Sequence, residues 1–327
     1  MIEKAKGKSN VQSLSGVKHI PSDAQIRNLL DPQEPELLDG VLRKGHELLR
    51  AGGQMEAFGS YAGQYLISCD GTGTISSQQI HCENCSQREM VNGEVLYIHY
   101  AILPVIVKAG DSRVLVLEPE FICPQDGHEK PDSYIALYEQ VEFLPRSGAV
   151  EQVRKRRWNG RYAEIEQYCL VNEVPIRCGE EALSVNWCEI TITREDTGRQ
   201  LYHNSFITHH TLNRSNVVAM VRDGQARWKS ENETNNVLKT KGYHLEHNFG
   251  HGQQHLVNFM LTLTLLAFLF HTLLDLLDEQ YRAVRHELVA RQDFFNDLRA
   301  LLRYMLFDNW RHLMHFMLVG LELIPDT

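Results

Sequence analysis

The order of apolar and polar positions changes character along the chain. Residues 1–58 carry helical signals, with Ser22 and Gln25 spaced as a capping box ahead of an apolar pair. Residues 62–122 hold three β-rich runs, YLISCD, EVLYIHYAILPVIVKAG and SRVLVLEPEFI, which are separated by glycine and polar turns. We expect three consecutive paired strands there, the first of them ending at Asp70.

The second half of the chain alternates again and then becomes helical. Residues 158–210 alternate in YAEIEQYCLV, LSVNWCEITITRE and YHNSFITHH, with turn signals at Asn172 to Pro175 and at Asp196 to Gly198. A short helix is expected around Tyr134 to Leu144, and the spacing is helical from Ser215 onward. An antiparallel β-block between strands and helices is typical of a domain inserted into an α/β core.

The pattern therefore predicts an α/β fold in four regions. These are a helical N-terminal region (1–58), the first part of the core (59–145), a β-rich insertion (146–212) and a helical second part of the core (213–327).

One apolar stretch has the length of a membrane span. LVNFMLTLTLLAFLFHTLLDLL at residues 256–277 approaches the roughly 20 residues that a transmembrane helix needs. Asn258, His271 and Asp275 interrupt it, and polar groups are costly in lipid. We expect the central buried helix of a soluble core. Partition into detergent would favour the alternative, a membrane-associated protein.

Composition narrows the classes of protein. With 327 residues, 43% hydrophobic and 23% charged, the chain is ordinary for a globular protein. A net charge of −9 argues against coating nucleic acid through a general positive field, so any DNA contact must use local patches. Seven cysteines and a start without an apolar signal region predict reduced thiols in the cytoplasm.

Two carboxylates are candidates for binding metal in phosphodiester chemistry. Such chemistry commonly uses divalent ions held by carboxylate oxygens. Asp70 closes an apolar run and precedes Gly71, although an aspartate there also suits a turn cap. Glu231 shares a face with Arg227 and Asn235 at α-helical spacing, although a surface ion pair has the same pattern.

Several motifs, in order over nearly the whole chain, resemble DDE transposases of bacterial insertion sequences. They are SCDGT around Asp70, IHCENC, LEPEFICPQDGHEK, VNW, RWKSENETNNVLKTKGYHLEHNFGHG with Glu231, and LLAFLFHTLLDL. The resemblance implies a ribonuclease-H-like core with a β-rich insertion before the helix that carries the glutamate. It also implies Mg²⁺ or Mn²⁺ bound by Asp70 and Glu231, and metal-dependent DNA cleavage and strand transfer.

The family pattern around the glutamate, Y-x2-R-x3-E-x6-K, is matched in part. Arg227 and Glu231 fit it, whereas Gly224 stands in place of Tyr and Leu238 in place of Lys, with Lys239 next to it. The side chains expected to contact DNA are Arg227, Trp228, Asn235, Lys239, Arg156 and Arg157.

The second aspartate of the family has no place in the chain. Only Cys123 to Asp132 separate the third expected strand from the next helix, which is too short for a helix and a strand. We infer an internal deletion near Lys130 and an incomplete core. Asp126 is a nearby loop carboxylate, but a loop ligand is poorly preorganised for catalysis.

Each of three further groups of residues has both a structural and a functional interpretation. Cys82 and Cys85 form a CxxC pair near His81 and His99; without a second CxxC, packed cysteines are favoured over zinc. The basic run from Arg154 to Arg157, with Trp158 and Arg161, suits either DNA backbone contact or a solvated loop. Four histidines, His244, His247, His251 and His255, lie close together and would suit a metal. No thiolate or carboxylate group obviously accompanies them, so they are interpreted mainly as polar packing or DNA contact groups.

The sequence thus predicts a transposase acting on DNA at insertion-sequence ends, as one chain or as a homodimer, and impaired by loss of its second aspartate. The alternative is a non-catalytic DNA-binding remnant of such an enzyme. No membrane partner is expected.

Overall fold

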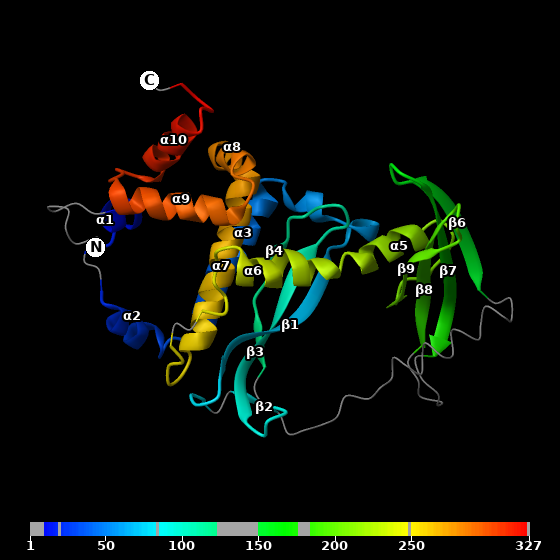
Figure 1. Ribbon diagram of the computed structural model, residues 1–327, viewed down its shortest axis with the longest axis horizontal. Helices are drawn as coiled ribbons and strands as arrows, with labels where there is room; N and C mark the ends of the chain where they lie inside the picture. The colour runs from blue at the N-terminus through cyan, green and yellow to red at the C-terminus, as the bar shows by residue number, and fades with distance from the viewer. Residues whose placement is uncertain are drawn as a thin grey trace. The chain divides into compact units, whose positions relative to one another are not determined.

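The computed structural model of the protein describes residues 10–18, 21–82, 85–122, 150–175, 184–247 and 250–325. They form the expected mixed α/β protein, with antiparallel sheets and helices at both ends of the chain (Figure 1). The chain divides into two compact units. Unit 1 comprises residues 1–59, 65–124 and 228–327, and unit 2 comprises residues 60–64 and 125–227. The four region boundaries expected from sequence stay predictions.

Unit 1 contains most of the described helices. The capping box at the start of α2 is confirmed, because Ser22 and Gln25 each accept a hydrogen bond from the other's backbone N–H. The helical segments of unit 1 are α1 (Asn10–Ser15), α2 (Asp23–Leu30), η2 (Pro35–Leu38), α3 (Asp39–Ala51), η3 (Met55–Phe58), η6 (Ser230–Asn235), α6 (Asn236–Thr240), α7 (Leu256–Leu277), α8 (Glu279–Glu287), α9 (Arg291–Tyr304) and α10 (Trp310–Gly320).

The sheet of unit 1 is built around one long strand, β3 (Val95–Val107). It pairs antiparallel with β1 (Leu66–Ser77) and also with β2 (Ser86–Glu89), β4 (Leu115–Val116) and β5 (Glu120–Ile122). The apolar runs therefore lie in antiparallel strands, although the third run is split into β4 and β5.

The prediction that the first strand ends at Asp70 is wrong. Asp70 pairs with Leu103 in the middle of the β1–β3 ladder, and β1 continues to Ser77. Gly71 and Gly73 look like turn residues in the sequence. They stay extended because each pairs with a residue of β3, Gly71 with Ile102 and Gly73 with Tyr100.

The apolar segment 256–277 forms helix α7, which packs on α3 and contacts β1 and β4. Gly45 of α3 allows the close approach, since a Cβ there would meet Leu269 at 3.0 Å. Within the described part of the chain, α7 is the one helix long and apolar enough to cross a membrane, and 44% of its apolar window is buried. The buried residues of α7 include Leu265 and Phe268.

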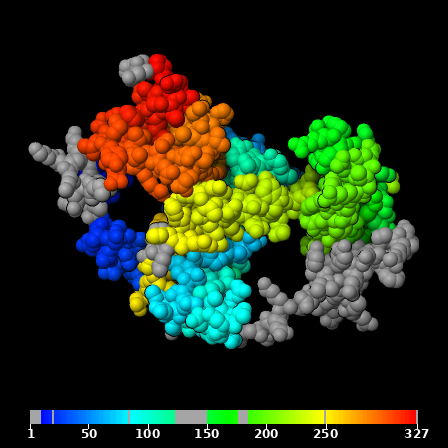
Figure 2. Space-filling model, in the orientation of Figure 1, coloured from blue at the N-terminus to red at the C-terminus, as the bar shows by residue number. Residues whose placement is uncertain are grey.

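The C-terminal helices share a second apolar cluster in unit 1. Tyr281 and Val284 of α8 pack with Phe294 of α9 and with Leu313 of α10. In the space-filling view, α8 to α10 form one continuous orange-to-red surface (Figure 2). Helix α1 contacts them through Asn10. The Asn10 side-chain amide donates to the carbonyl oxygens of Leu302 and Met305 at 2.9 and 2.7 Å.

Unit 2 is an antiparallel sheet of four strands in the order β6 (Glu151–Trp158), β7 (Ala163–Pro175), β8 (Ser184–Arg194) and β9 (Gln200–Thr208), with η4 (Tyr61–Gly63) and α5 (Val217–Gln225). Tyr168, Leu170 and Ile190 of the sheet form its core with Val217 and Val221 of α5. These strands confirm the antiparallel β-block that the alternating pattern predicts.

One of the two turns expected in this block is confirmed. Gly198 adopts a φ of 68° and donates to the carbonyl oxygen of Arg194, closing the turn after β8. The turn expected at Asn172 to Pro175 is wrong, because β7 runs through it with a bulge between Val171 and Val174. Asn172 holds this bulge in place through hydrogen bonds to the backbone of Leu212.

The expected helix at Tyr134 to Leu144, the inferred deletion near Lys130, and Asp126 and Asp132 all lie outside the described residues.

Candidate functional site

Asp70 lies on the face of β1 that η6 covers. Alternate residues of a strand share a face, so Ser68 and Thr72, both buried, flank Asp70. The Ser68 Oγ donates to Ser230 Oγ at 3.1 Å, and the amide of Asn235 donates to Asp70 Oδ2 at 2.8 Å. These two hydrogen bonds join β1 to the segment that carries Glu231.

That segment, η6, is a π-helical turn rather than α-helix. The backbone N–H of Asn236 donates to the carbonyl oxygen of Glu231, five residues earlier. This wider turn places Ser230 and Asn235 on the side that contacts β1, whereas Glu231 is exposed. Glu231 and Asn235, which share a face at α-helical spacing, thus differ in exposure, and Arg227 lies in a turn that precedes this segment.

Asp70 and Glu231 thus come from adjoining segments of unit 1. Asp70 accepts one of the two hydrogen bonds between β1 and η6, and Glu231 follows Ser230, which accepts the other. Asn235 is 6% exposed, and its side-chain oxygen has no hydrogen-bond partner among the described residues. Since buried polar atoms are rarely left unpaired, a third group is expected to meet this oxygen beside Asp70.

The other DNA-binding candidates near Glu231 are partly engaged. Trp228 is 45% exposed, and the Lys229 ammonium lies 4.7 Å from the centre of its ring. The Lys239 ammonium forms an ion pair with Glu246 at 2.8 Å. Glu246 thus already neutralises part of the charge that Lys239 would offer to a phosphate.

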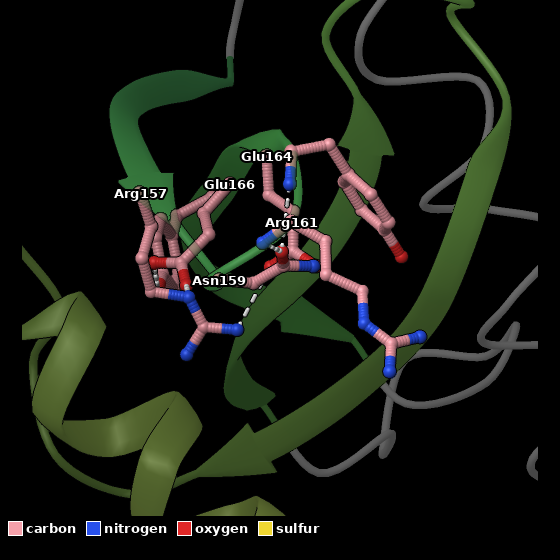
Figure 3. Close-up of polar contacts among 7 residues, drawn as sticks. Arg157, Asn159, Arg161, Glu164 and Glu166 are labelled. Carbon is pink, nitrogen blue, oxygen red and sulfur yellow. Dashed lines mark hydrogen bonds and ion pairs between the residues drawn. The ribbon is translucent and has the colours of Figure 1, made fainter.

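The basic run forms β6, an edge strand, rather than a loop. Arg156 pairs with Glu195. Arg157 pairs with Glu164 and Glu166 (Figure 3). The carboxylates of Glu164 and Glu166 are buried and accept further hydrogen bonds, from Asn159 and Tyr168 respectively. Part of the positive charge on this strand is therefore already neutralised within unit 2, and charged edge strands also resist sheet-to-sheet association.

Replacing Arg157 by Ala is expected to lower the free energy of unfolding of unit 2 by about 1–3 kcal/mol, because two buried carboxylates lose a charged donor. The Arg157 hydrogen bond, followed by that of Asn159, lowers the pKa of Glu164, so this contribution is lost as pH falls. Solvent at the 58% exposed Arg157 side chain keeps the effect below that of a fully buried pair.

Urea unfolding followed by tryptophan fluorescence, to which Trp187, 3% exposed in unit 2, contributes, measures this difference. Arg161→Ala is the matched control, since the Arg161 guanidinium extends away from the carboxylates (Figure 3). Equal unfolding midpoints for Arg157→Ala and the unaltered chain would contradict the prediction.

A cleft of about 360 Å³ in unit 1 is lined by more cations than anions. Its lining includes Arg113, Arg282, Arg285 and Arg291, but only two carboxylates, those of Glu233 and Asp275. Burial, and then the positive charge of Arg291, lower the pKa of the Arg285 guanidinium. An anion in this cleft would offset that repulsion, and Glu233 belongs to the same helical turn as Glu231.

Cys82 and Cys85 meet His99 of β3 and His251, which precedes α7. Cys85 and His99 are buried; burial, followed by the charge of His251, lowers the pKa of His99 to about 4. His81, which neighbours the pair in sequence, instead stacks on Tyr97. The sequence analysis placed His99 near the CxxC pair, but it did not connect His251 with the two cysteines.

The chain was compared with known protein-family models and with curated proteins. No family model and no curated protein matches it.

Proposed function

We propose that this protein is a DDE-type transposase, acting on DNA at the ends of an insertion sequence, and that its cleavage activity is impaired. The contact between β1 and η6 carries the proposal, because it brings Asp70 and Glu231 into adjoining segments. A strand aspartate beside a helical glutamate is the arrangement expected of a ribonuclease-H-like core. The antiparallel sheet around β3 is compatible with that core.

The oxygen donors at this junction suit Mg²⁺ or Mn²⁺. Asp70 and Glu231 would hold the ion, and the unpaired side-chain oxygen of Asn235 is a further donor of the hard type that these ions prefer. A bound ion would stabilise charge on the reacting phosphate. Asn235 orients the Asp70 carboxylate through its amide.

Loss of the second aspartate explains why weak cleavage is expected. In the described part of the chain, the clusters of three or more His, Cys, Asp or Glu ligands include neither Asp70 nor Glu231. Two carboxylates without a third hold a metal less firmly, and the transition state is then less stabilised.

The DNA backbone needs local positive charge in a chain whose net charge is −9. The arginine-lined cleft supplies such charge in unit 1, with Arg282 exposed at its edge. We assign this cleft, together with Trp228 and Lys239, to phosphate and base contacts around the cleavage site.

A nicking assay with Mg²⁺ or Mn²⁺ on the element's own end sequence tests the enzyme. We expect slow cleavage that Asp70→Asn and Glu231→Gln each reduce by about 100-fold or more. Asp297→Asn, which alters an exposed carboxylate on α9, is the matched control and should retain activity. Cleavage that survives both active-site substitutions would overturn the assignment of the catalytic residues.

A non-catalytic DNA-binding remnant is the second candidate, because no third carboxylate, histidine or cysteine joins Asp70 and Glu231 among the described residues. Such a protein would shift end-sequence DNA in a gel without nicking it, and its affinity would fall steeply with salt. Arg282→Ala should weaken binding for both candidates. Absence of both binding and nicking would reject the DNA function itself.

A further inference from the structure

Four side chains that are far apart in sequence converge on one point of unit 1. Cys82 and Cys85 lie between β1 and β2, His99 lies in β3, and His251 lies between α6 and α7. Their four ligand atoms all lie within 4.8 Å of one another. A surface cluster of ordinary polar groups has no reason to bring two sulfurs and two ring nitrogens so close together.

The distances within the cluster have the pattern of a metal coordination shell. The two Sγ atoms are 3.9 Å apart, and the two Nε2 atoms are 3.2 Å apart. The sulfur-to-nitrogen distances are 3.4 Å from Cys82 to His99 and 3.3 Å from Cys85 to His251.

Zinc bonds of about 2.3 Å to sulfur and about 2.0–2.1 Å to nitrogen define a tetrahedron of known size. Its edges are about 3.8 Å between sulfurs, about 3.5 Å between sulfur and nitrogen, and about 3.3 Å between nitrogens. The four distances above follow this order, each within a few tenths of an ångström, and the two remaining sulfur-to-nitrogen pairs lie within 4.8 Å. We infer that Cys82, Cys85, His99 and His251 bind one structural Zn²⁺.

Neighbouring groups orient the ligands. The Nδ1 of His251 lies 3.2 Å from the carbonyl oxygen of Gly252, so a proton on Nδ1 leaves Nε2 free to bind metal. The side chain of Asn258 in α7 neighbours His99. The backbone N–H of Cys82 lies 3.4 Å from Cys85 Sγ, where it supports a thiolate.

The donor set selects both the metal and its role. Two thiolates and two imidazoles are soft and borderline ligands, which suit Zn²⁺ and do not suit Mg²⁺. All four positions come from the protein, so no open position remains for substrate, and the site is structural rather than catalytic. The CxxC pair needs no second CxxC, because the two histidines complete the set.

The ion would fasten the turn before β2 to β3 and to the segment that enters α7. That segment is held from its other side by Asp31, which accepts hydrogen bonds from the backbone N–H groups of Gln253, Gln254 and Leu256. The inference does not depend on the proposed DNA chemistry, since neither Asp70 nor Glu231 belongs to the cluster.

Metal analysis of the full chain tests the site directly. Purified under reducing conditions without added metal, the protein should carry about one Zn²⁺ per chain. Replacing the zinc by Co²⁺ should give the visible absorption of tetrahedral cobalt together with sulfur-to-cobalt charge transfer. A folded chain without zinc, and without these cobalt bands, would overturn the inference, and this arm needs no variant.

Matched variants then assign the ligands. Cys85→Ser and His251→Asn should each reduce bound zinc to background, whereas Cys69→Ser and His255→Asn, which alter residues outside the cluster, should retain it. Zinc that persists in both ligand variants would place the ion elsewhere and reject the site. A disulfide between Cys82 and Cys85 in reduced preparations, found by mass spectrometry, would also reject it.

Discussion

Chelation of zinc should lower the free energy of unfolding of unit 1 by about 4 kcal/mol when the control sample contains free zinc at a thousandfold excess over Kd. The reason is mass action. The folded chain holds the ligands at positions 82, 85, 99 and 251 together around the ion, whereas the unfolded chain does not. Cys85→Ser should unfold at the same denaturant concentration with zinc or with chelator.

Hydrogen exchange locates this effect within the chain. Chelation should speed amide exchange in β2 and in residues 251–256, because the ion and Asp31 together hold these segments. The strands β6 to β9 belong to unit 2 and serve as an internal control whose exchange should not change. Exchange that rises equally in both units would indicate global unfolding, and unchanged exchange everywhere would reject a stabilising ion.

Local signals in the sequence predicted local structure well. The capping box at Ser22, the turn at Gly198 and helix α7 each depend on residues close together in the chain. Alternation over residues 158–210 likewise predicted antiparallel strands, because a pairing strand of that period buries one face. The physical cause and the sequence pattern lie in the same short segment.

The misplaced features depend on partners that are distant in sequence. The strand β1 continues past Asp70 because β3 pairs with it there. The glycine after Asp70 predicts a turn, and the local sequence does not show that a pairing strand is available. The π-helical turn of η6 aligns Ser230 and Asn235 with β1, a contact that α-helical spacing does not anticipate. His251 joins Cys85 across 166 residues, so only the fold completes the cysteine–histidine cluster.

The candidate active site combines features that depend on nearby residues with features that depend on residues distant in sequence. Its residue types, Asp70 and Glu231, were predicted from sequence, whereas the hydrogen bond that orients Asp70 was not. Asn235 was expected to contact DNA, yet in the structure its amide is buried against β1. Asn235 is therefore better placed to position Asp70 than to reach a phosphate directly.

Lowering the pH from about 7.5 to about 5 should destabilise unit 1 through His271 by about 1–2 kcal/mol. Burial, followed by the positive charges of Arg291 and Arg285, lowers the pKa of His271 from 6.5 to about 4. Its Nδ1 lies 2.6 Å from the Tyr281 hydroxyl, a contact that suits the neutral ring. Below pH 6.5 the unfolded chain takes up a proton that the folded chain refuses, so stability falls until the pH reaches about 4.

His271→Gln isolates this contribution, because glutamine can still accept a hydrogen bond from Tyr281 but does not titrate in this range. Urea unfolding of both proteins at several pH values should give a stability difference that changes by about 1–2 kcal/mol between pH 7.5 and 5. All other titrating groups are common to the two chains and cancel in that difference. A difference that stays constant with pH would mean that His271 takes up its proton in the folded state as readily as in the unfolded chain.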